Sequence, residues 1–149
     1  VHAPFLRRGG MNRIRRRRFG GDERGQALVE FALVLPVLLI LLLGIIDFAR
    51  AWNVYQVLTD AGREGAREAV VANGLDVPAI QGIVIAAAGR AGIGLTNSDV
   101  TVDLGANRGD PTTVTVSYTH SLRYVGWALG LFGSDGDIPL NVVSTMRTE

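Results

Sequence analysis

One stretch near the N-terminus, residues 27–46, constrains this chain more than any other feature. It reads ALVEFALVLPVLLILLLGII and carries a single charge, on Glu30. A helix of this length rises about 30 Å, the thickness of the hydrocarbon core of a bilayer. A buried core helix is the alternative, but the part of the chain that follows is too small to enclose a helix that is apolar on every side. The stretch therefore predicts a membrane-spanning helix.

Charge is distributed unevenly about this apolar run. The first 25 residues carry eight Arg and two acids, a net charge of +6, whereas the remainder carries seven Arg and twelve acids, a net charge of −5. Because basic flanks stay on the cytoplasmic side of a membrane, we expect a cytoplasmic leader (1–25), one pass through the cytoplasmic membrane (26–46) and residues 47–149 outside. The sequence leaves Val1 and Met11 open as the start.

A cleaved secretory signal is a further alternative for this N-terminal region. Ala49 and Ala51 form a small-x-small site beyond the apolar run. The run is longer than the apolar region of most signal peptides, which favours a retained span.

Composition excludes several classes of function. The chain has no Cys and only two His, His2 and His120, so it lacks the residues for a disulfide scaffold, a Cys-zinc site or a Ser-His-Asp triad. No paired carboxylates, nucleophile elbow or metal cluster can be placed, and no basic stripe follows residue 25. We therefore expect no catalytic residue, metal or cofactor, no nucleic-acid partner and no enzymatic activity; a membrane-anchored hydrolase is the weakest alternative.

The residues that open the apolar run resemble a pilin processing site. Residues 24–31, RGQALVEF, are similar to the cleavage site of prepilins in the tight-adherence (Tad/Flp) pilus system, and the wider run to about residue 70 is similar to its TadE-like pseudopilins. The resemblance implies that a prepilin peptidase cuts after Gly25. Gln26 then becomes the N-terminus. Glu30 and Phe31, the fifth and sixth residues of the mature chain, form the assembly motif. It also implies other pilin or pseudopilin subunits and the Tad assembly platform as partners.

Glu30 invites a physical explanation of its own. A carboxylate near the start of a membrane helix costs a few kcal/mol, roughly, so it usually has a partner or a purpose. After cleavage, the new ammonium group of Gln26 is the natural partner, in the same chain or in a neighbour. Alternatively, Glu30 lies at the interface, in the first turn of a helix whose dipole favours an acid there.

The helix is predicted to continue from the span to about residue 71, through an extension over residues 47–72. Pro36 removes one backbone hydrogen bond within the span and predicts a kink. Beyond the span, the small residues Ala61, Gly65 and Ala69 recur every fourth position, which lets another backbone approach closely. We expect this strip to serve helix packing during assembly.

The region from 73 to 149 predicts a small α+β domain. Asp76 is a candidate N-cap, with Pro78 in the first turn of a helix that ends near Arg90. Alternating apolar residues predict three strands, with these inward positions: Val100, Val102 and Leu104; Val114, Val116 and Tyr118; Ile138, Leu140 and Val142. Between the last two strands, residues 124–132 carry no charge. They either cover the sheet, which we favour, or form a partner surface.

Together these features predict a pilin-like α+β fold: a long N-terminal transmembrane helix, a short second helix and a three-stranded antiparallel sheet. The expected function is structural, as a TadE-like minor pilin or pseudopilin in assembly of an adhesion pilus, located in the cytoplasmic membrane or in the extracellular pilus. The alternative is an uncleaved bitopic membrane protein whose outer domain binds a ligand or partner. An intact N-terminus on the mature chain would distinguish the second from the first.

Overall fold

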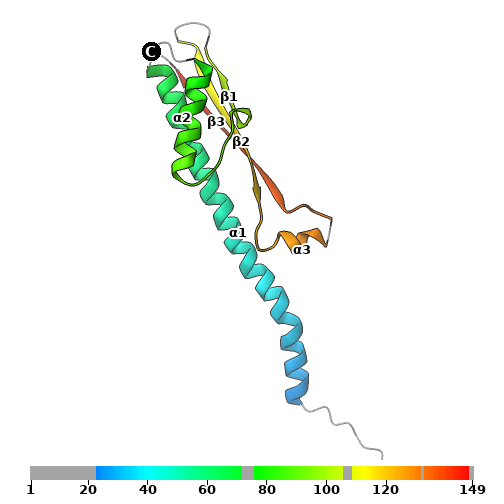
Figure 1. Cartoon of the computed structure of the whole chain (residues 1–149). Helices are drawn as coiled ribbons and strands as arrows, with labels where there is room; N and C mark the ends of the chain where they lie inside the picture. The colour runs from blue at the N-terminus through cyan, green and yellow to red at the C-terminus, as the bar shows by residue number, and fades with distance from the viewer. Residues whose placement is uncertain (1–22, 72–75, 106–108, 132, 148–149) are drawn as a thin grey trace, which may run out of the picture. The chain divides into compact units, whose positions relative to one another are not determined.

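The computed structural model describes residues 23–71, 76–105, 109–131 and 133–147 (Figure 1). Its elements are α1 (Glu23–Val71), α2 (Val77–Arg90), a 3-10 turn (Asn97–Asp99), β1 (Val100–Asp103), β2 (Pro111–Ser121), α3 (Gly126–Gly130) and β3 (Asp137–Arg147). The predicted fold class is confirmed: a long apolar N-terminal helix and a short second helix accompany a three-stranded antiparallel sheet.

The chain divides into two compact units, Val1–Leu35 and Pro36–Glu149. In the first unit, residues 23–35 are helical, and the side chains from residue 25 onward are exposed. Most of the expected leader, residues 1–22, lies outside the described residues. The second unit holds the remainder of α1 and every other element.

The apolar part of α1 is not a core helix. Its most apolar 18-residue window has a mean hydropathy of 2.9, and none of that window is buried inside the protein. A soluble protein would bury such a surface, because the free energy falls when apolar area is removed from water. A single helix of this kind fits a single-pass membrane protein.

Local sequence signals account for α2. The Asp76 carboxylate accepts a hydrogen bond from the Ala79 backbone N–H at 3.1 Å, as an N-cap does, and Pro78 lies in the first turn. The helix ends at Arg90, and Gly92 follows with a φ of +78°, a conformation that only glycine adopts without strain. The predicted start and end of this helix are both confirmed.

The sheet has the strand order β1-β2-β3, with both neighbouring pairs antiparallel. Val116 is its central position, opposite Val100 on one side and Val142 on the other. The predicted alternation is confirmed along β2, where Val114 and Val116 are fully buried. Leu104 differs from the prediction, because β1 ends at Asp103 and the Leu104 side chain is 38% exposed.

One hydrophobic core joins the C-terminal part of α1 to α2 and the sheet. It places α2 against α1 on one side and the strands on another (Figure 1). Its buried residues include Leu58, Ala61 and Ala66 of α1, Ile80, Val84 and Ala88 of α2, and Val100, Val114, Val116 and Val142 of the sheet. The second half of α1 therefore packs with α2 and the sheet as one folded domain, called the outer domain below after the location that the sequence predicts for it.

Candidate functional site

The residues of the predicted processing site lie in the first turns of α1. Gly25, Gln26, Glu30 and Phe31 are all exposed, and Phe31 retains 59% of its accessible surface. Gln26 and Glu30 are four positions apart, so they lie one above the other on the same helix face. A cut after Gly25 would therefore leave the new amine one helical turn from the Glu30 carboxylate.

Pro36 lies inside α1, and the helix is assigned without interruption on both sides of it. Because proline has no backbone N–H, one hydrogen bond of the helix is missing at this residue. The kink that the sequence suggests at this residue stays a prediction.

The small-residue strip of α1 packs against α2 of the same chain. Ala61 and Gly65 are buried and Ala69 is half-buried. A Cβ atom built at Gly65 would overlap a methyl group of Val84 and would lie 3.6 Å from a methyl group of Ile80. The close helix approach indicated by the spacing is thus made within the outer domain, and the strip needs no neighbouring subunit to explain it.

Gly65→Ala is expected to destabilise the outer domain by about 1–3 kcal/mol, because the added methyl group meets the fully buried Val84 side chain. Gly82→Ala, on the exposed face of α2, is the matched control. Nothing lies within 4 Å of its Cβ position, so it should stabilise α2 by about 0.5–1 kcal/mol. Thermal unfolding of both variants in detergent measures the difference. Equal melting temperatures for the two variants would contradict this packing.

Asp47 is the functional candidate that sequence reasoning missed. It directly follows the apolar run, yet its side chain is only 1% exposed. The carboxylate accepts three backbone hydrogen bonds: from Arg123 at 3.3 Å to one oxygen, and from Tyr124 and Val125 at 2.8 Å each to the other. Such donors compensate the loss of water around a buried charge. No local sequence pattern predicts this contact, because the residues that donate to Asp47 lie 76 to 78 positions further along the chain.

Residues 123–131, called the α3 segment below, are held by Asp47 beside the end of the apolar run. Val125 and Leu129 line a shallow groove of about 430 Å³ with Ile40, Leu41, Gly44, Ile45 and Phe48 of α1. One turn beyond Asp47, the Arg50 guanidinium lies 4.9 Å from the centre of the Tyr124 ring, a cation–π contact. The favoured expectation for this segment was that it covers the sheet; instead it packs on α1, with Trp127 and Leu131 exposed.

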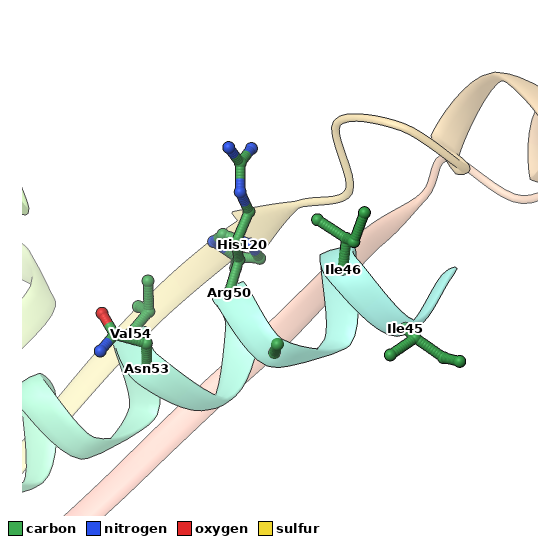
Figure 2. Close-up of a pocket in the computed structure, with 7 residues that line it drawn as sticks. Ile45, Ile46, Arg50, Asn53, Val54 and His120 are labelled. Carbon is green, nitrogen blue, oxygen red and sulfur yellow. The ribbon is translucent and has the colours of Figure 1, made fainter. Parts of the chain in front are cut away.

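A second groove, of about 560 Å³, follows the same turns of α1 on another side. Figure 2 shows its labelled side chains, of which His120 comes from β2 and the others from α1. Its wall is mainly apolar, from Ile45, Ile46 and Val54, with Arg50 and His120 as the basic groups. Among the described residues, no group of three His, Asp or Glu side chains could hold a metal ion. These surfaces are suited to packing and to contact with lipid.

Comparison with known protein families bears on the resemblance that the sequence suggests. The family model described as TadE-like protein matches residues 25–67. This segment is similar to a TadE-like domain. The match begins at the predicted processing site, ends within α1, and confirms the family resemblance seen in the sequence.

The TadE-like domain supports a Tad pilus-related protein that is pilin-like and associated with a membrane. It comprises the apolar run and the part of α1 that carries Asp47 and Gly65. No curated protein and no solved structure matches the chain. The contacts of α2, α3 and the sheet with the TadE-like domain therefore come from this structure alone.

Proposed function

We propose that this chain is a minor pilin or pseudopilin, a structural component in the assembly of a Tad/Flp-type adhesion pilus. The observation that carries the proposal is the order of features at the head of the TadE-like domain. A basic segment precedes Gly25, and Glu30 and Phe31 occupy the fifth and sixth positions after it, at the start of an exposed apolar helix. TadE-like proteins are structural pilus components, and this role requires no catalytic site.

In this proposal the leader is cytoplasmic, the apolar run crosses the cytoplasmic membrane once, and the outer domain is extracytoplasmic. The excess of Arg before residue 25 favours this orientation. A prepilin peptidase removes the leader, and the processed chain associates with other pilin or pseudopilin subunits and with the Tad assembly platform. The long apolar surface that faces lipid in the membrane then faces other helices in the assembly.

The Gln26 amine and the Glu30 carboxylate are the pair on which assembly depends. Their four-residue separation brings them to one face of the helix, which supports a charge pair within one subunit or between two. Inside an apolar helix bundle a lone carboxylate or ammonium group is costly, whereas a paired one is tolerated. Removal of the leader thus creates the counter-charge that Glu30 needs.

Gly25→Leu is expected to leave the full leader attached, because the resemblance to prepilins implies that the peptidase cuts after a glycine. The wild-type chain should begin at Gln26 when a prepilin peptidase is present and should keep its leader when the peptidase gene is deleted. N-terminal sequencing of membrane and sheared-pilus fractions measures both results, with Gly21→Leu as a control glycine inside the leader that should leave cleavage unchanged.

Two results would overturn this assignment. A mature chain that begins at Trp52 would identify a conventional signal peptide. An intact N-terminus in a peptidase-positive strain would favour the alternative, an uncleaved bitopic protein with a partner- or ligand-binding outer domain.

A further inference from the structure

The α3 segment has an exposed apolar surface that the outer domain does not use. From Tyr124 to Ser134 the sequence YVGWALGLFGS contains no charged residue. Trp127 is 64% exposed and Leu131 77% exposed, and Phe48 on the adjacent turn of α1 is 67% exposed. Large apolar side chains gathered in this way on a soluble surface mark a contact with another phase or molecule.

The position of this segment along α1 identifies what covers it. A Cβ atom built at Gly44 would lie 3.9 Å from a Val125 methyl group, and the groove shared with Val125 and Leu129 extends down α1 to Ile40. Gly44 and Ile40 lie two and six residues inside the end of the apolar run, about 3 Å and 9 Å at the helical rise. The α3 segment therefore overlaps the span in depth, where lipid surrounds any surface that protein does not cover.

From this overlap we propose that the α3 segment is an interfacial membrane anchor, inserted at the boundary between headgroups and acyl chains of the leaflet that faces the outer domain. Helices that lie in this boundary bury their apolar face about 5–10 Å deep, similar to the distance of about 9 Å from Ile40 to the end of the apolar run. Trp127 and Tyr124 are the residue types that favour the boundary, and Arg50 and Arg123 can extend to the headgroups. The proposal rests on the membrane span and not on the pilus role.

The three hydrogen bonds to Asp47 make this arrangement possible. Backbone N–H groups that enter the boundary region without a partner lose their hydrogen bonds to water. The Asp47 carboxylate accepts hydrogen bonds from the N–H groups of residues 123–125, which directly precede α3. Asp47 is thus the residue that positions this anchor, and Trp127 and Leu131 are the side chains of the anchor that contact lipid.

The chain offers a direct test, because it contains only two tryptophans, Trp52 and Trp127. Each is exposed, so Trp52→Phe and Trp127→Phe should both fold, and each variant leaves one fluorescent reporter. The full chain is placed in lipid nanodiscs, where both faces are accessible. The quenchers are phosphatidylcholine brominated near the glycerol end of its acyl chains, and aqueous iodide.

In the Trp52→Phe variant, brominated lipid should remove most of the Trp127 emission, and iodide should remove little. In the Trp127→Phe variant, Trp52 should show weaker quenching by lipid and stronger quenching by iodide, since it lies six residues beyond the apolar run, about 9 Å further out. Strong iodide quenching of Trp127 would overturn the proposal. Protection of Trp127 from both quenchers that grows with the protein-to-lipid ratio would also overturn it, by identifying a second copy of the chain as the occupant. Neither result depends on leader processing or on pili, so failure here is distinct from failure of the pilus role.

Discussion

Replacing Asp47 by Ala is expected to release the α3 segment from α1 while the core around Leu58 and Val116 stays folded. The substitution removes the two carboxylate oxygens that accept hydrogen bonds from three backbone N–H groups. Hydrogen bonds to a charged group contribute about 1.5–3 kcal/mol each, so the docked conformation should lose about 3 kcal/mol or more. Amide hydrogen exchange at Tyr124 and Val125 should then accelerate about a hundredfold, since 1.4 kcal/mol corresponds to a factor of ten.

Asp47→Asn provides a graded comparison. Its single amide oxygen can still accept from Tyr124 and Val125, which share one carboxylate oxygen, and only the longer bond from Arg123 is lost. Its exchange rates should lie between those of the wild type and the Ala variant. Asp60→Ala is the control on the same helix, because Asp60 is exposed and makes a loose ion pair with Arg63 at 3.7 Å. If Asp47→Ala and Asp60→Ala left exchange at residues 124 and 125 equally slow, the anchoring role of Asp47 would be wrong.

Glu30→Gln is expected to yield a processed, membrane-resident protein that fails to enter its assembly. The Gly25–Gln26 bond is unchanged, so cleavage should persist. In the assembly, the Gln26 ammonium would face apolar helices without a counter-charge. Breaking a buried ion pair in this way costs about 3–5 kcal/mol, which shifts an association equilibrium by a hundredfold or more.

The measurement compares leader cleavage, membrane level and pilus formation in the wild-type strain and the Glu30→Gln strain. Glu68→Gln, on the part of α1 within the outer domain, removes the same charge far from the processing site and should leave piliation unchanged. If Glu30 were only an interfacial acid in the first turn of a helix, its removal would slightly ease insertion and change little else. Normal piliation of the Glu30→Gln strain would reject the charge-pair mechanism and leave the membrane span intact.

The elements that sequence predicted correctly are those with local causes. The Asp76 cap and Pro78 determine the start of α2, and alternation along β2 predicts which of its faces is buried. These signals act within a few residues, where backbone geometry alone determines the pattern. The family motif at the start of α1 is local in the same sense, because it is read along one continuous stretch.

The features that sequence did not predict depend on contacts between distant segments. The spacing of Ala61, Gly65 and Ala69 indicates a close helix approach, but not that α2 of the same chain makes it. The burial of Asp47 depends on a loop 76 residues away, and α3 is a five-residue helix with too few turns for a periodic pattern. Whether an acid beside an apolar run faces water or a folded loop is decided by tertiary structure.

The coverage of one face of α1 by α2 and the sheet limits how many neighbours each part of the helix can have. Residues 27–39 are exposed on every side of the helix, so several helices can surround them at once. Near Leu58 and Ala66 that freedom ends, because one side of the helix is enclosed by its own domain. Neighbouring chains can approach this part on the side that the described residues of its own domain leave open. In a bundle of such chains, each helix could therefore contact several neighbours along its apolar part, but neighbours on one side only along its folded part.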